Sequence, residues 1–216
     1  MTDTLSNAAI HEVLARAVEQ HQAGRLAEAE SLYRRILANS PDQPDAWHLL
    51  GLVALAAGRG REAIDLIARA VSLLPSNADF RFSLGTAQHT EGRFEDAAAS
   101  YRSAIELEPG MAVAHNNLGL SLHELEQIDA SLVALQRAHE LAPDAADVWK
   151  NFAMVLKERG RLEEAETAAR KAVALAPESA YALVELGSVL AKRGRFDEAI
   201  AALRRARASA PHDAAL

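Results

Sequence analysis

Histidines and paired carboxylates are the groups in this sequence with the most scope for chemistry, and the spacing of the histidines argues against a metal site. Three of the eight histidines, His21, His89 and His123, fall at equivalent positions of a repeating pattern that is described below. If that pattern reflects stacked helical units, the three rings lie about 10 Å or more apart, whereas a bond to zinc is only about 2 Å long. The sequence also lacks a His-Glu-x-x-His pattern. We therefore expect no metal ligand and no metal cofactor.

Two adjacent carboxylate pairs, Glu163-Glu164 and Asp197-Glu198, are explained by helix geometry without acid–base catalysis. Both pairs open a predicted helix, where negative side chains offset the partial positive charge of the helix N-terminus. The chain has no cysteine, and so no thiolate nucleophile or disulfide. It has neither a nucleophile-elbow glycine motif nor a phosphate-binding Gly-Lys-Ser/Thr loop. We expect no catalytic residue, no cofactor and no enzyme activity within these residues.

Net charge and hydropathy restrict the class of partner. With 23 basic and 30 acidic residues the formal charge is -7, whereas binding to nucleic acid phosphates needs a basic surface. The basic cluster of Arg204, Arg205 and Arg207 has no interleaved aromatic residue and is expected to be a solvated helix face. No signal sequence and no apolar segment of about 20 residues is present. We expect a cytoplasmic protein that binds neither nucleic acid nor a membrane.

The elements that carry these side chains follow a single period. Prolines occur at one constant interval, which we call the repeat period, at Pro41, Pro75, Pro109, Pro143, Pro177 and Pro211. A glycine shares this register except where Glu126 replaces it: Gly24, Gly58, Gly92, Gly160 and Gly194. An alanine shares it except where Ser131 replaces it: Ala29, Ala63, Ala97, Ala165 and Ala199. One small unit is therefore repeated six times.

Each unit has the pattern of two helices joined by a turn. In the second unit, large and small residues recur at three- and four-residue steps and share one helix face: Trp47, Leu50, Gly51 and Ala54. Gly58 then makes the turn, and a second helix with Ala63 and Ile67 on its inner face ends before Pro75. Gly51 and Ala63 are small enough for the two backbones to approach closely. A single hairpin cannot bury its apolar faces, so we expect the hairpins to stack.

The run Trp47-x2-Leu50-Gly51, followed by Ala63, Ile67 and Pro75, resembles the tetratricopeptide repeat, and the third and fourth units repeat the match. The resemblance implies an all-α fold, a right-handed superhelical α-solenoid of six antiparallel helix-turn-helix hairpins, whose first helices line a concave groove. We expect a lead-in at residues 1–9, the start of a further or capping helix at 214–216, and repeats at 10–43, 44–77, 78–111, 112–145, 146–179 and 180–213.

The two ends of the array depart from the pattern. Arg16 and Gln20 stand where other units have large packing residues, as expected of an end helix with one side in water. Arg207 and Ser209 likewise replace apolar residues of earlier units and indicate a solvated end, yet residues 211–216 keep the register of a further first helix. We expect the natural chain to continue past Leu216, and the terminal repeats leave self-association open.

The first helices of the third to fifth units carry the candidate binding residues. Asn117 and Asn151 are one repeat period apart, so we expect them to stack as rungs that face a water-filled groove and hydrogen-bond the backbone of an extended peptide. The alternative is an ordinary polar concave wall. The full candidate set mixes amide, aromatic, aliphatic, thioether, imidazole and lysine side chains: Phe82, Thr86, His89, Asn116, Asn117, Leu120, His123, Lys150, Asn151, Met154 and Lys157.

These observations favour a protein–protein interaction scaffold that binds an extended peptide or partner segment. Asparagine rungs are similar to those in the repeat region of O-GlcNAc-type glycosyltransferases, although Leu49, Ser83 and Glu185 occupy equivalent sites here. The alternative is therefore the substrate-recruiting module of a larger glycosyl-, sulfo- or methyltransferase whose catalytic domain lies outside this chain. A regulatory peptide sensor is a third interpretation. A chaperone-type carboxylate clamp is disfavoured, because Glu185 takes the place of its last cation.

Overall fold

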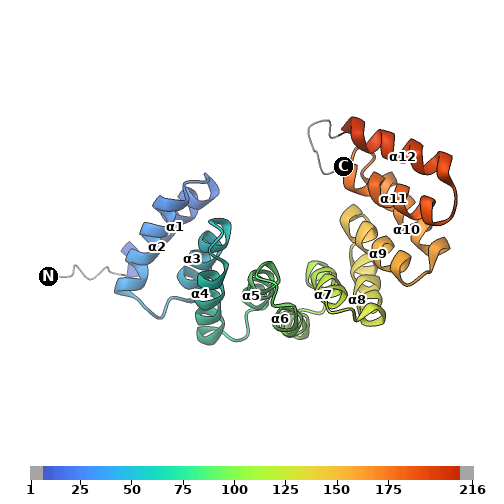
Figure 1. Ribbon diagram of the computed structural model, residues 1–216. Coiled ribbons are helices and arrows are strands. Elements are labelled where there is room, and N and C mark those ends of the chain that lie inside the picture. Colours follow the sequence, from blue (N-terminus) through green and yellow to red (C-terminus); the bar gives the residue numbers. More distant parts are fainter. Residues whose placement is uncertain (1–6, 210–216) are drawn as a thin grey trace. The chain divides into compact units, whose positions relative to one another are not determined.

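The computed structural model describes residues 7–209, and this part of the chain contains twelve α-helices and no strand (Figure 1). The all-α prediction is confirmed. Consecutive helices pair into antiparallel hairpins. Residues 210–216, including Pro211 and the expected helix start at 214–216, lie outside the described residues. The helices are α1 Asn7–Gln22, α2 Leu26–Asn39, α3 Pro44–Ala56, α4 Gly60–Leu73, α5 Ala78–Thr90, α6 Phe94–Leu107, α7 Ala112–Glu124, α8 Ile128–Leu141, α9 Ala146–Glu158, α10 Leu162–Leu175, α11 Ala180–Lys192 and α12 Phe196–Ser209.

The turn inside each hairpin requires a left-handed residue. At the second turn, Gly58 has φ 74°, its N–H donates to the Leu55 carbonyl, and Arg59 N–H donates to Ala54. Glycine adopts this conformation without steric penalty. In the fourth hairpin Glu126 takes the same place with φ 57°, and its N–H donates to His123. The turn is therefore kept there at the expense of backbone strain.

Small residues let the two helices of a hairpin approach closely. A Cβ atom added to Gly51 would lie 2.5 Å from Cγ1 of Ile67 and 3.3 Å from the Ala63 carbonyl oxygen. Ala97 and Ala165, at the position of Ala63, are fully buried, which confirms the crossing predicted from the repeat.

The fourth hairpin has a polar residue at this crossing. Ser131 is fully buried, and its Oγ donates a 2.7 Å hydrogen bond to the Gly119 carbonyl. The hydroxyl is therefore satisfied by the first helix of its own hairpin.

The chain divides into two compact units, Met1–Pro109 and Gly110–Leu216. Unit 1 holds helices α1 to α6 and unit 2 holds α7 to α12. Within each unit the second helix of a hairpin packs against the first helix of the next, as α4 does on α5 and α10 on α11. Each unit has its own apolar core, centred on residues such as Ile36 and Leu50 in unit 1 and Leu135 and Leu156 in unit 2. Stacking between hairpins thus buries faces that one hairpin alone would leave exposed.

An ion-pair network reinforces the stacking in unit 1. Arg34 of α2 lies 2.8 Å from both Glu30 and Glu62, and Arg59 lies 2.5 Å from Glu30 and 2.8 Å from Glu62. The four side chains link the first and second hairpins. Hydrogen bonds from Arg59 and Arg34 lower the pKa of Glu30.

The same network recurs in unit 2, four repeats further along the chain. Glu166 takes the place of Glu30 and lies 2.7 Å from Arg170 and 2.5 Å from both Arg193 and Arg195. Arg170 and Arg195 also contact Glu198, at 3.1 and 2.5 Å. Burial is the largest influence on the pKa of Glu166 and raises it, but the arginine hydrogen bonds outweigh burial and the net pKa is lowered.

Candidate functional site

Unit 2 places most of the predicted binding residues on two adjacent first helices, α7 and α9. The remaining three, Phe82, Thr86 and His89, belong to α5 in unit 1. Those on α7 are Asn116, Asn117, Leu120 and His123, and those on α9 are Lys150, Asn151, Met154 and Lys157. We use the name unit 2 face for the surface formed by these residues of α7 and α9 together with Tyr181, Glu185 and Ser188 of α11.

Three asparagines form a hydrogen-bonded ladder across this face. Asn151 Nδ2 donates to Asn116 Oδ1 at 2.9 Å, and Asn116 Nδ2 donates to Asn117 Oδ1 at 3.0 Å. Asn151 is only 7% exposed, so the expectation that it faces open water was wrong. Asn151 bonds Asn116 of α7, which is the residue before its repeat equivalent Asn117. Within the described residues, Asn117 Nδ2 has no hydrogen-bond partner, so the half-buried Asn117 is the free end of the ladder.

Lys157 is neutralised on the unit 2 face. Its Nζ lies 2.9 Å from Glu185 Oε1 and 3.0 Å from Ser188 Oγ, and the lysine and glutamate side chains are each 13% exposed. This half-buried pair joins α9 to α11. His123 is similarly paired, with Nε2 2.7 Å from Glu158. The unit 2 face therefore presents little free charge along α9.

Tyr181 and Lys150 form the open edge of the unit 2 face. Lys150 Nζ lies 5.9 Å from the centroid of the Tyr181 ring, a distance at which a cation is attracted to an aromatic face. Tyr181 is 65% exposed. The sequence interpretation stopped at the fifth repeat and missed this tyrosine. Tyr181 stands one repeat period after Asp147, which lies three residues before the candidate Lys150, so extending the same helix face into the sixth repeat could have identified it.

The predicted residues of unit 1 are held by contacts inside their own hairpin. The Phe82 ring packs 5.7 Å from Tyr101, whose hydroxyl donates to Thr86 Oγ1 at 3.3 Å. His89 packs against Phe94 at 5.1 Å. These contacts show how α5 and α6 are joined, and they leave the phenyl ring of Phe82 half-buried.

In the second repeat, His48 occupies the position equivalent to Asn116. Its Nε2 lies 2.9 Å from Ser83 Oγ, and its ring packs 4.6 Å from Phe80. Burial lowers the pKa of His48, and the nearby Asp45 and Asp79 oppose that shift more weakly. The histidine is therefore a packed side chain that links α3 to α5.

Two profiles of the tetratricopeptide repeat family match the sequence. One matches residues 4–44, 14–78, 48–112 and 150–214, and the other matches residues 110–178. Together these matches cover most of the chain. The chain belongs to the tetratricopeptide repeat family. A comparison with curated protein sequences finds no match.

Several solved structures share this fold at low sequence identity. The type IV pilus biogenesis factor PilW has a TM-score of 0.86 and 17% identity, over 97% of each chain. PilF of Pseudomonas aeruginosa has a TM-score of 0.82 and 17% identity, over 96% of this chain and 94% of its own. YrrB, described as a TPR protein with an unusual peptide-binding site, has a TM-score of 0.66 and 20% identity, over 84% of this chain and 93% of its own.

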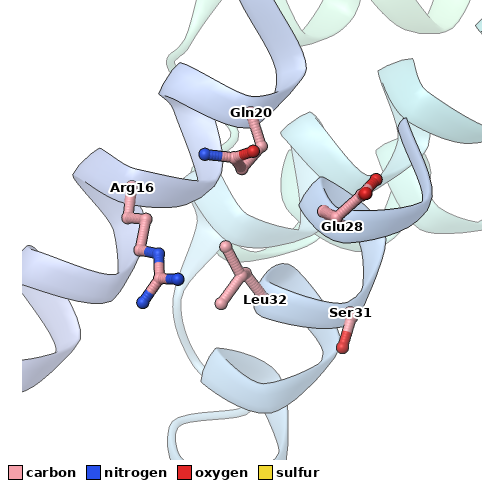
Figure 2. Close-up of a pocket in the computed structure, with 5 residues that line it drawn as sticks. All are labelled: Arg16, Gln20, Glu28, Ser31 and Leu32. Carbon is pink, nitrogen blue, oxygen red and sulfur yellow. The ribbon is translucent and has the colours of Figure 1, made fainter. Parts of the chain in front are cut away.

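A shallow hollow lies on the first tetratricopeptide repeat (Figure 2). It encloses about 270 Å³. Figure 2 shows the lining residues, Arg16 and Gln20 on α1 and Glu28, Ser31 and Leu32 on α2. Arg16 is at the position of the buried Leu50, and Gln20 is at the position of the buried Ala54. The hollow therefore lies on a face of the first repeat that carries polar side chains where the second repeat buries apolar ones.

Neither a cluster of metal-ligand side chains nor a membrane-spanning helix occurs in the described part of the chain. Among residues 7–209, no three histidine, aspartate or glutamate side chains gather closely enough to hold a metal ion. None of the helices α1 to α12 has the length and apolar character that crossing a bilayer requires.

Proposed function

We propose that this tetratricopeptide chain is a non-catalytic protein-interaction module and that its unit 2 face binds an extended polypeptide segment. The observation that carries the proposal is the free end of the asparagine ladder at Asn117. Asn117 Nδ2 is a donor that can bind a carbonyl group of a peptide backbone. The ladder holds this donor in place before the ligand arrives, which reduces the entropy lost on binding.

The charge of the unit 2 face favours recognition of the backbone over recognition of acidic side chains. Lys157 is compensated by Glu185, and Lys150 lies 3.8 Å from Asp147 and over the Tyr181 ring. An exposed tyrosine beside a lysine stem offers a flat surface for an apolar or aromatic side chain of the ligand. YrrB, which has the same fold, is described as having a peptide-binding site, and this supports a peptide as the class of ligand.

The experiment is selection of peptides from a random phage-displayed library on the immobilised full chain. A selected peptide is then titrated against the wild type and against Asn117→Ala, Tyr181→Ala and a matched control, Gln136→Ala on α8. The first two changes are expected to weaken binding, by about two- to fifteenfold for the single neutral hydrogen bond of Asn117. The control is expected to bind normally. Peptides that bind equally well to all four proteins would show that the ligand contacts another surface.

A further inference from the structure

Among the described helices, α12 exposes an apolar stripe at positions that earlier repeats bury fully or in part. Phe196, Ile200 and Leu203 are 64%, 47% and 41% exposed. At the position of Leu203, Ile67 and Leu135 are fully buried. The helical spacing of 196, 200, 203 and 207 places these side chains on one face.

This stripe is accompanied by charges of opposite sign at its two ends. Asp197 lies in the first turn of α12, whereas Arg204 and Arg207 lie in its last two turns. Within the described residues, none of these three side chains has a salt-bridge partner. Ile200, Leu203, Arg204 and Arg207 together line a shallow hollow of about 280 Å³. The face is thus apolar in the middle, acidic at one end and basic at the other.

We propose that this face of α12 packs against the α12 of a second copy of the chain, in an antiparallel arrangement with two-fold symmetry. In the register that pairs Ile200 with Leu203 of the second copy, Phe196 meets Arg207 of that copy. Asp197 then lies on the same flank as Arg204 of the second copy. Two-fold symmetry generates each contact twice, so one self-complementary surface serves both chains.

Antiparallel packing follows from the order of the charges. A parallel pair would place Arg204 beside Arg204 of the other copy and leave Asp197 beside its own equivalent, and both contacts are repulsive. The antiparallel pair brings acid to base at both ends and keeps the aliphatic residues in the centre. Phe196 also receives the long stem and guanidinium of Arg207, a favourable partner for an aromatic face.

A head-to-tail contact between the two ends of the array fits the side chains poorly. Within the array, His139 of α8 packs 5.0 Å from Phe152 of α9. The equivalent residues at the chain ends are Arg207 and Arg16, two like charges. The first repeat also presents Gln20, where the fourth, fifth and sixth repeats present leucine (Figure 2). The N-terminal face is therefore unsuited to covering α12.

The size of the surface predicts a weak dimer. A seam on one helix of 14 residues is smaller than the roughly 800 Å² per partner of stable complexes. Association is therefore expected to depend on protein concentration.

The test is sedimentation velocity of the full chain over a wide concentration range. Leu203→Glu is expected to abolish the dimer. Arg204→Asp and Asp197→Arg are each expected to raise its dissociation constant by about three- to thirtyfold, because each charge change is made twice by symmetry. The double variant Asp197→Arg/Arg204→Asp is expected to restore association. Circular dichroism establishes that each variant is folded, and Arg69→Asp on α4 is the matched control.

Three results would overturn the proposal. The first is a wild-type chain that remains monomeric at every concentration, which would leave the stripe to be covered by the chain that follows α12. The second is a double charge reversal that associates no better than the single ones. The third is a dimer that survives Leu203→Glu but is lost on Arg16→Glu, which would establish a contact through the N-terminal repeat.

Discussion

Glu166 occupies the position in the fifth repeat that Glu30 occupies in the first, and each carboxylate holds the arginines that lie 4 and 29 residues further along the chain. The Glu166 side chain is 8% exposed and that of Glu30 is 22% exposed. Hydrogen bonds from Arg59 and Arg34 lower the pKa of Glu30. At Glu166, burial is the largest single influence and raises the pKa, but the hydrogen bonds and charges of Arg170 and Arg195 together outweigh burial, so the pKa is lowered there too. These carboxylates therefore connect neighbouring hairpins only while they are ionised.

Replacing Glu166 with glutamine is expected to lower the free energy of unfolding at neutral pH by about 1 to 3 kcal/mol, because the hydrogen bonds lose their ionic character. A folded-state pKa below the unfolded-state value adds stability above the unfolded pKa, and this stability is lost as the pH falls through the folded pKa. The difference between wild type and variant should therefore shrink below about pH 4. Urea unfolding at a series of pH values measures it.

Glu140→Gln is the control for this experiment. Glu140 pairs at 3.0 Å with Arg137 on the surface of α8, where both side chains are about half exposed. Solvent screens such a pair, so the variant should lose much less stability than Glu166→Gln. A stability difference at Glu166 that stayed constant from neutral to acid pH would rule out ionisation as its cause.

The left-handed Glu126 makes the fourth turn a point of strain. Glu126→Gly is expected to raise the free energy of unfolding by about 0.5 to 1 kcal/mol, because glycine adopts φ 57° without a clash. In the wild type, amide hydrogen exchange should be faster around residues 124–130 than around 158–164, where Gly160 makes the equivalent turn.

Two variants separate backbone strain from the charge of Glu126. Glu126→Ala removes the carboxylate but keeps a Cβ atom, so it should gain less stability than Glu126→Gly. Gly160→Glu introduces the strain at the fifth turn and should destabilise the chain. Equal stability of the alanine and glycine variants would attribute the effect to charge.

The buried alanines at the hairpin crossings set the distance between helices. Ala97→Leu and Ala165→Leu should each lower the free energy of unfolding by about 1 to 3 kcal/mol, because the added methyl groups overpack a fully buried site. Ala99→Leu, at an exposed position of α6, is the matched control and should change stability little. Unchanged thermal midpoints for both buried variants would contradict the crossing geometry.

The repeat architecture could be predicted because it depends on local signals. Proline ends a helix, glycine permits a left-handed turn and a small residue permits close packing, wherever they stand in the chain. Their recurrence at one constant period was enough to locate the turns at Gly58 and Glu126 and the buried Ala97 and Ala165.

The unit 2 face could be predicted only in part, because its side chains are paired with residues of neighbouring helices. Asn116 bonds Asn151, 35 residues away, and Lys157 bonds Glu185, 28 residues away. Side-chain length and rotamer decide which of several neighbours is reached, and a repeat period does not contain that information. Asn151 was therefore expected to be open, although it is buried.

The two asparagines of the ladder should differ in their effect on stability. Asn151 is 7% exposed and donates to Asn116, so Asn151→Ala removes a buried side chain, leaves the half-buried Asn116 acceptor without its donor and should lower the free energy of unfolding by about 1 to 3 kcal/mol. Asn117 is half-buried at the end of the ladder, and Asn117→Ala should change stability by less than about 0.5 kcal/mol while weakening a selected peptide. Urea unfolding and peptide titration of the same two variants measure both effects. If Asn117→Ala proved as destabilising as Asn151→Ala and bound the peptide normally, the ladder would be a structural brace with no share in ligand binding.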